Sequence, residues 1–128
     1  MEKIFNILLV DDEPDFLEPI AFWLESKKYK VRTAPNGEEA IKLIKKEIPN
    51  IVLLDINMPV MNGIETLKHI RENYGDLPVI MITAEIEKLP ALQDMGISGF
   101  FPKEGTLQQL EQLLDPIIRM HAKMNSSQ

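Results

Sequence analysis

The chain has 128 residues, a length that favours one domain with a hydrophobic core of its own. Acidic residues outnumber basic ones by 20 to 14, and the resulting net charge of -6 argues against nonspecific binding to nucleic acid or anionic lipid. Cysteine is absent, which excludes disulfide scaffolds, thiolate metal sites and cysteine nucleophiles. Because no apolar run has membrane-spanning length and the N-terminus lacks a secretory pattern, we expect a cytoplasmic location.

The first strand and helix are predicted from a hydrophobic run and the residues after it. Ile4 to Val10 is nearly continuous in apolar residues and stops at three acids, which are Asp11, Asp12 and Glu13. Pro14 suits the first turn of a helix, whose apolar positions recur at three- and four-residue spacing. Pro19 predicts either a kink or a helix whose regular part begins near this residue.

The next two units follow the same pattern. Residues 29–34 predict a short edge strand, and Asn36 with Glu39 has the spacing of a helix-capping box. The apolar stripe expected for that helix comprises Ala40, Ile41, Leu43, Ile44 and Ile48. Residues 51–54 are all apolar and predict a strand buried on both faces, which ends at Asp55. Pro59 then forces a turn before a second capping pair at Asn62 and Glu65.

The last two strands also end in polar side chains. Residues 78–83 predict a buried strand that ends at Thr83, and residues 99–102 predict a brief strand before Lys103. Between them, Pro90 interrupts a weak helical pattern, so we expect a short or irregular helix. Thr106 and Gln109 cap a final helix, which Pro116 is expected to bend or shorten, and from about Met120 we expect a frayed polar tail.

Five strand–helix units without a long linker predict a single α/β domain with a parallel sheet and helices on both faces. The carboxyl ends of parallel strands meet at one edge, where open α/β sheets bind ligands. We therefore expect the following side chains to converge: Asp11, Asp12, Asp55, Thr83 and Lys103.

These side chains suit phosphoryl chemistry. Crowded carboxylates repel each other unless a cation neutralises them, and Mg²⁺ prefers such oxygen ligands. Lys103 can place its charge on a phosphoryl oxygen and the Thr83 hydroxyl can donate to another. Asp55 is then left as a nucleophile able to form an acyl phosphate, so the sequence predicts a phosphoryl acceptor.

Four ordered motifs resemble the receiver domain of bacterial two-component response regulators, a family that includes the chemotaxis regulators. They are LLVDDE at 8–13, LLDINMPVMNG at 53–63, MITAE at 81–85 and GFFPK at 99–103. The resemblance implies a flavodoxin-like sheet in the order 2-1-3-4-5. It places the receiver domain at residues 1–119 and leaves residues 120–128 as the tail.

The resemblance also implies a role for each matching residue. Asp55 would be phosphorylated. Mg²⁺, or Mn²⁺ in its place, would be bound directly by the side chains of Asp12 and Asp55 and by the backbone carbonyl of Asn57, while Asp11 would help through a water molecule. Thr83 and Lys103 would bind the phosphoryl group, and Phe100 would occupy the aromatic switch position. Asn57 and Glu85 stand where the family tunes hydrolysis of the acyl phosphate.

The implied partners are a sensor histidine kinase or a histidine phosphotransfer protein, and a downstream target or output domain. The output surface would be the face made by the fourth helix, the fifth strand and the fifth helix, with no direct contact to nucleic acid or membrane. The domain would phosphorylate and dephosphorylate itself with Mg²⁺ but would not be an enzyme acting on a separate substrate.

Other hypotheses about the function of the chain stay open at this point. The chain could be a relay intermediate that passes the phosphoryl group to another histidine, or an interaction module that is never phosphorylated. A phosphoaspartate enzyme is disfavoured because such families usually place a second acid two residues after the nucleophile, where this chain has Asn57. Glu104 follows Lys103 where many receivers have proline, so the conformation of that loop is left open.

Overall fold

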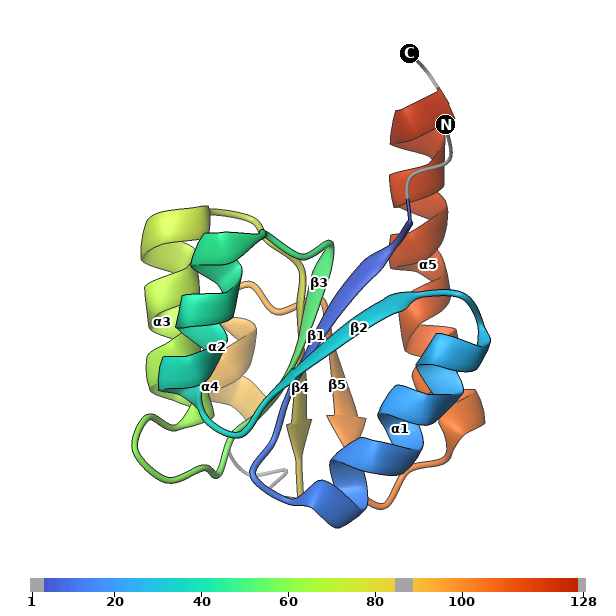
Figure 1. Ribbon diagram of the computed structural model, residues 1–128. Helices are drawn as coiled ribbons and strands as arrows, with labels where there is room; N and C mark the ends of the chain where they lie inside the picture. The colour runs from blue at the N-terminus through green and yellow to red at the C-terminus, as the bar shows by residue number, and fades with distance from the viewer. Residues whose placement is uncertain (1–3, 85–88, 127–128) are drawn as a thin grey trace.

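One five-stranded parallel sheet organises the molecule (Figure 1). The computed structural model describes residues 4–84 and 89–126. Its elements are β1 (Asn6–Val10), α1 (Pro14–Ser26), β2 (Lys30–Ala34), α2 (Gly37–Lys46), β3 (Ile51–Asp55), α3 (Gly63–Tyr74), β4 (Val79–Thr83), α4 (Leu89–Gln93), β5 (Gly99–Pro102) and α5 (Leu107–Ser126). The strand order is β2-β1-β3-β4-β5, with every neighbouring pair parallel, which confirms the predicted flavodoxin-like fold.

Helices cover both faces of the sheet. Figure 1 shows α1 and α5 on one face and α2, α3 and α4 on the other. Strands β1, β3 and β4 are buried along their whole length, as their continuous apolar sequences require. Because alternate side chains point to opposite faces, Leu8 and Leu54 join one core cluster while Ile7 and Leu53 join the other. The sheet therefore lies between two hydrophobic core clusters.

Three helix starts are capped as the sequence predicts. The Asn36 side chain accepts a hydrogen bond from the Glu39 backbone N–H at 2.9 Å. Asn62 and Glu65 form a full capping box, in which each side chain accepts from the other residue's backbone N–H. Residues 106 and 109 bond in the same reciprocal way before α5. These caps satisfy backbone donors that would otherwise lack partners at a helix start.

Two helix predictions need correction. Of the two outcomes predicted at Pro19, the late helix start is wrong, because α1 begins at Pro14 and includes Pro19; the kink stays a prediction. The Glu13 carbonyl accepts hydrogen bonds from the backbone of Phe16 and Leu17, both at 3.0 Å, and so closes the first turn. Ile48 is not part of the buried stripe of α2; it is 58% exposed, because the backbone leaves the helix in an extended conformation at Glu47.

The last helix is longer than the sequence predicts. Helix α5 includes Pro116 and continues to Ser126, so residues 120–126 are helical rather than frayed. The His121 ring packs edge-on against Phe5, with 5.2 Å between centroids, and this contact ties the extension to the start of the chain. The short helix α4 agrees with the weak pattern around Pro90. Among the helices of residues 4–84 and 89–126, none is both long and apolar enough to cross a membrane.

Candidate functional site

The sheet register brings four chain positions to one edge. Asp11 directly follows β1, Asp55 ends β3, Thr83 ends β4, and Lys103 directly follows β5. The Lys103 backbone N–H donates to the Thr83 carbonyl at 3.1 Å, so the ladder between β4 and β5 extends to the lysine. The strands thus fix the Cα positions of all four residues, and side-chain geometry decides how closely their polar groups approach.

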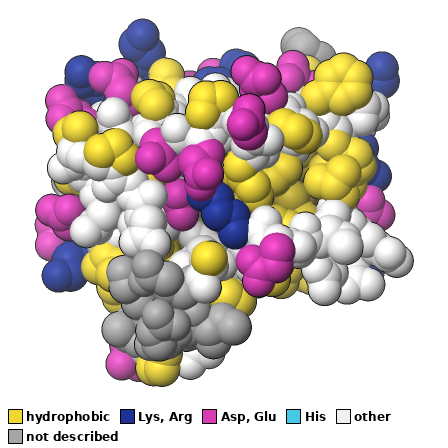
Figure 2. Space-filling model, turned by 90° about the horizontal axis from the view of Figure 1, so that it is seen from below, with side chains coloured by type: hydrophobic (Ala, Val, Ile, Leu, Met, Phe, Trp, Pro, Cys, Tyr) yellow, Lys and Arg dark blue, Asp and Glu magenta, His cyan; other side chains and the backbone are white. Residues whose placement is uncertain are grey.

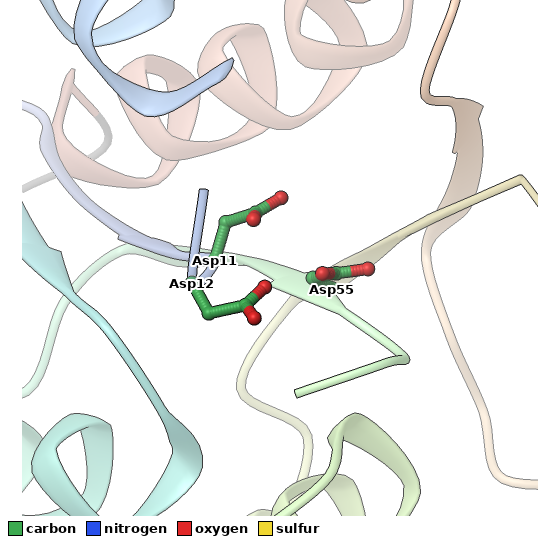
Figure 3. Close-up of side chains that lie close together, drawn as sticks. All are labelled: Asp11, Asp12 and Asp55. Atoms are coloured by element: carbon green, nitrogen blue, oxygen red, sulfur yellow. The ribbon is translucent and has the colours of Figure 1, made fainter. Parts of the chain in front are cut away.

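Three carboxylates lie together at this edge (Figure 3). Asp11, Asp12 and Asp55 each offer an oxygen atom, and these three atoms all lie within 4.8 Å of one another. Asp11 and Asp55 are only 0% and 2% exposed, whereas Asp12 is open to solvent. Two of the three charges are therefore held where water cannot fully solvate them.

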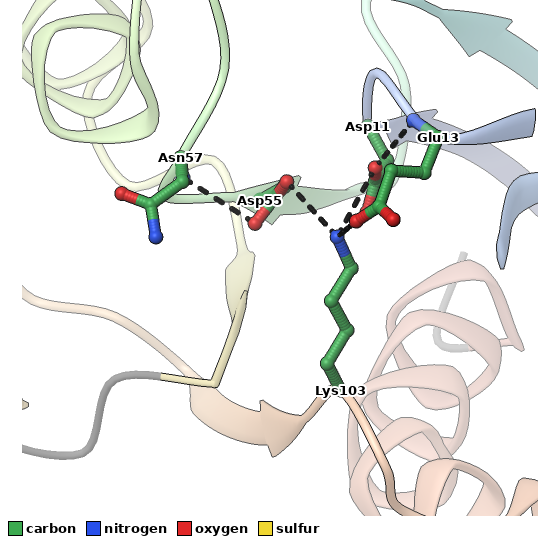
Figure 4. A network of polar contacts seen from close by, with 5 residues as sticks. All are labelled: Asp11, Glu13, Asp55, Asn57 and Lys103. Carbon is green, nitrogen blue, oxygen red and sulfur yellow. Dashed lines mark hydrogen bonds and ion pairs between the residues drawn. The ribbon is translucent and has the colours of Figure 1, made fainter.

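Lys103 reaches into this cluster from the loop after β5 (Figure 4). Its Nζ atom lies 3.2 Å from Asp11 Oδ2 and 3.4 Å from Asp55 Oδ2, and it also donates to the Glu13 carboxylate. Figure 2 looks onto this edge and shows acidic side chains around a basic one, with hydrophobic side chains beside them. One ammonium group is thus shared among three carboxylates.

Burial shifts the acid–base behaviour of the cluster. Desolvation, reinforced by the nearby charge of Asp11, raises the pKa of Asp55 to about 6, despite the opposing charge of Lys103. Desolvation also raises the pKa of Asp11, although a hydrogen bond from the Glu13 backbone and the contact with Lys103 oppose this shift. The carboxyl edge therefore lacks enough positive charge to stabilise its ionised carboxylates fully.

Lys103 responds in the opposite direction. Burial alone would lower the pKa of Lys103, but the hydrogen bond to Glu13 and the charges of Asp55 and Asp11 raise it well above its usual value. The side chain therefore stays a cation at any physiological pH. A fixed positive charge beside a buried carboxylate is suited to binding an anionic group that approaches that carboxylate.

The loop after Asp55 packs tightly against the end of β3. A Cβ atom added at Gly63 would lie 2.2 Å from the Asp55 carbonyl oxygen, so only glycine fits there. The Asn57 backbone N–H donates to Asp55 Oδ1 at 3.4 Å, a long contact that restrains the carboxylate. In the same loop Val60 has a φ of 70°, and the Met61 N–H donates to the Pro59 carbonyl at 2.8 Å, which makes a strained γ-turn.

The loop after β5 turns without a cis bond. No peptide bond in residues 4–84 and 89–126 is cis, which includes the one between Lys103 and Glu104. The Gly105 N–H donates to the Pro102 carbonyl at 2.8 Å and closes a turn around these two residues. This turn directs Lys103 back towards the carboxylates.

The donor set fits a hard divalent cation. All three side chains offer oxygen, and Mg²⁺ binds through one or two carboxylates while it keeps several waters. The buried Asp11 Oδ2 atom accepts no hydrogen bond from the described residues, although Lys103 Nζ lies 3.2 Å away. A buried carboxylate oxygen without a hydrogen bond is available to a metal, so the residues present are compatible with Mg²⁺.

Two further candidate residues lie on the neighbouring strands. Thr83 is 1% exposed at the end of the neighbouring strand. Phe100 lies on β5 and is half-buried, whereas its neighbour Phe101 is 1% exposed and belongs to the core. Glu85 falls outside the described residues. The structure adds Glu13, whose contact with Lys103 spans 90 positions in the chain and has no local sequence signal.

Comparison with known families agrees with this geometry. Residues 7–115 match the response regulator receiver domain family, and the chain belongs to this family. This finding bears out the resemblance on which the sequence interpretation rests, and it makes the chain a component of two-component signalling.

Individual relatives add detail. The chain is 33% identical over 117 residues to PhoP, the transcriptional regulatory protein for alkaline phosphatase synthesis of Bacillus subtilis; the match covers 89% of this chain but only 48% of PhoP. The chain thus spans about half the length of that curated relative.

Two solved structures are also similar. The response regulator TrrA of Thermotoga maritima, crystallised in complex with Mg²⁺ and BeF, is 31% identical with a TM-score of 0.82, covering 89% of this chain and 99% of TrrA. The chemotaxis protein CheY4 of Vibrio cholerae is 29% identical with a TM-score of 0.84, covering 90% of this chain and 99% of CheY4.

Proposed function

We propose that this receiver domain is a phosphorylation switch that accepts a phosphoryl group on Asp55. The observation that carries the proposal is the meeting of three carboxylates and Lys103 at the carboxyl edge, with Asp55 buried at the end of the central strand. The donor would be a phosphohistidine of a sensor kinase or of a histidine phosphotransfer protein. The cytoplasmic location expected from the sequence stays a prediction.

Asp11, Asp12 and Asp55 would hold Mg²⁺, together with the backbone carbonyl of Asn57. When bound, the ion would supply positive charge that offsets the negative charge of the transferring group. The compatible donor set and the Mg²⁺–BeF complex of TrrA support this part of the proposal.

The transfer itself would be an in-line displacement. An oxygen of Asp55 forms a bond to phosphorus while the bond between phosphorus and the histidine nitrogen breaks, and the nitrogen keeps the electron pair. Lys103 binds one phosphoryl oxygen through its ammonium group, and the Thr83 hydroxyl donates to another. Asp55 carries the phosphoryl group after this step. Water later hydrolyses the acyl phosphate and restores Asp55, at a rate that Asn57 and Glu85 would tune.

Phosphorylation would change the output surface. Thr83 would move towards the phosphoryl group, and Phe100 on the neighbouring strand would turn inward. The face built from α4, β5 and α5 would then bind a downstream target or an attached output domain. About 5.5 kcal/mol of differential binding is needed to move a two-state domain from 1:99 to 99:1, so partner binding would share the work with the threonine contact.

Intact-mass spectrometry tests the acceptor. The protein is incubated with Mg²⁺ and acetyl phosphate, beside an Asp55→Asn control and a sample with excess EDTA. One phosphoryl adduct is expected in the wild type with Mg²⁺, and none in either control. A folded wild type that gains no adduct would leave a noncatalytic interaction module as the better function.

A further inference from the structure

Glu13 holds Lys103 although it does not belong to the three-carboxylate cluster. It is the N-cap residue of α1, yet within the described residues its side chain makes no capping hydrogen bond. The carboxylate instead accepts from Lys103 Nζ, while the Glu13 backbone N–H donates to Asp11 Oδ1 at 2.8 Å. The Glu13 side chain is 61% exposed, so it can leave this contact without disturbing the core.

The first turn of α1 contacts Lys103 through a second residue. The Lys103 ammonium lies 5.2 Å from the centre of the Phe16 ring, a distance at which a cation is attracted to an aromatic face. Glu13 and Phe16 thus hold the lysine from the α1 side, while Asp11 and Asp55 contact it from the sheet. The position of the ammonium group depends on which of these neighbours remain available.

Metal and phosphoryl binding would remove the sheet partners. With Asp11 and Asp55 engaged by Mg²⁺ and by the phosphoryl group, the Glu13 carboxylate would remain able to pair with Lys103. The ammonium group has three N–H donors, so a phosphoryl oxygen would approach it while the Glu13 carboxylate still attracts the same positive charge. We propose that Glu13 is a positioning residue that competes with the incoming phosphoryl group for Lys103 and so slows phosphorylation; this inference rests on the function proposed above.

The contact between Glu13 and Lys103 would slow phosphorylation but strengthen Mg²⁺ binding. While Glu13 shares the charge of Lys103, the lysine competes less with a divalent cation for Asp11 and Asp55. Removing the Glu13 charge therefore leaves Lys103 to pair more fully with those carboxylates, which weakens Mg²⁺ binding. Faster phosphorylation at saturating Mg²⁺ together with weaker Mg²⁺ binding is a combination that general structural damage would not produce.

The test compares Glu13→Gln with Glu18→Gln in the full chain. Both variants remove one negative charge, from the N-cap of α1 and from α1 itself, but Glu18 is an exposed residue outside the Lys103 contacts. Glu13→Gln is expected to raise the second-order rate constant for acetyl phosphate by about two- to fivefold over Glu18→Gln, the size of one partly exposed ion pair. Calorimetric titration should show a Mg²⁺ dissociation constant about twofold higher or more for Glu13→Gln than for Glu18→Gln.

The outcomes separate this inference from the proposed function. Equal or slower phosphorylation of Glu13→Gln, or equal Mg²⁺ binding by the two variants, would overturn the competition. If the wild type itself accepts no phosphoryl group, the proposed function fails, and the Mg²⁺ titrations still decide whether Glu13 shares the charge of Lys103. Thermal unfolding checks that Glu13→Gln is folded, and Glu13→Ala repeats the test without an amide that could replace the hydrogen bond.

Discussion

Both edges of the sheet contain carboxylates and a lysine, but the pKa of the carboxyl group is lowered at the amino edge and raised at the carboxyl edge. At the amino edge, Asn6, Lys30, Glu47 and Asn50 join the starts of β1, β2 and β3. Glu47 accepts from Lys30 Nζ at 2.8 Å and also from the Asn6 amide, and these bonds lower the pKa of Glu47. The Asn6 backbone N–H donates to Asn50 Oδ1 at 2.7 Å. At this edge the exposed carboxylate of Glu47 is therefore paired with the ammonium group of Lys30.

At the carboxyl edge the balance is reversed. Asp11 and Asp55 are buried beside Asp12, and the lysine that contacts the two buried carboxylates is shared with Glu13. Burial raises the pKa of Asp55, whereas the hydrogen bonds of Glu47 lower the pKa of Glu47. The two edges therefore differ in charge balance: the amino edge pairs its carboxylate with a lysine, whereas the carboxyl edge keeps excess anionic charge, which the proposed metal and phosphoryl binding would use.

The largest expected effect is a gain in stability from Asp55→Asn in the absence of metal. Burial raises the pKa of Asp55 from 3.8 to about 6, so the ionised carboxylate is disfavoured in the folded state at pH 7. Asparagine removes this charge, and the free energy of unfolding should rise by about 2–3 kcal/mol. Urea unfolding in EDTA measures the change.

The amino edge supplies the matched control. Glu47→Gln removes a carboxylate that is well paired and should lower the stability slightly rather than raise it. A stability gain of equal size in both variants would show that the two edges do not differ, and no gain in Asp55→Asn would remove the electrostatic basis of the comparison.

The pH dependence of stability should show the same difference. Because the pKa of Asp55 is raised on folding, the folded state binds more protons than the unfolded state between about pH 4 and pH 6. The contribution of Asp55 to the free energy of unfolding is fully present below pH 3.8 and is lost as the pH rises through about 6.

Metal-free wild type should therefore gain about 1 kcal/mol relative to Asp55→Asn when the pH falls from 7 to 5. Urea unfolding of both proteins in EDTA at a series of pH values tests this expectation. Parallel pH curves for the two proteins would contradict a raised pKa at Asp55.

A further effect of about the same size concerns the backbone. Val60 has a φ of 70° and is 74% exposed, so its branched side chain adds strain to the loop after Asp55 and little packing. Asparagine tolerates this conformation, and Val60→Asn should raise the free energy of unfolding by about 1 kcal/mol.

Lys28→Asn is the control at the other edge. Lys28 follows α1 with a φ of 74°, but its side chain is not β-branched, so the gain there should be smaller. Thermal unfolding of the two variants compares them, and a larger gain from Lys28→Asn would show that strain is not concentrated beside the acceptor.

Most of the fold follows from the sequence because its signals are local. Continuous apolar runs predict the buried strands, and pairs such as Asn62 with Glu65 predict the helix starts. The convergence of Asp11, Asp55 and Lys103 also follows, since parallel strands place their carboxyl ends together.

The features that sequence reasoning missed depend on contacts between distant residues. Glu13 looks like an ordinary acid at a helix start, and only the three-dimensional structure shows that it pairs with Lys103. The helical extension past Met120 is polar in sequence and packs through His121 on Phe5, at the other end of the chain. The left-handed conformation of Val60 is equally hidden, since valine rarely adopts it.

The measurement that tests the central claim most directly is chemical mapping of the phosphorylated residue. Borohydride reduces an acyl phosphate to an alcohol, so phosphorylated protein treated in this way would carry homoserine in place of the modified aspartate. Peptide mass spectrometry after incubation with Mg²⁺ and acetyl phosphate should find homoserine at position 55 and at no other position. Homoserine at position 11 or 12, or unmodified Asp55 in protein that carries a phosphoryl group, would contradict the account.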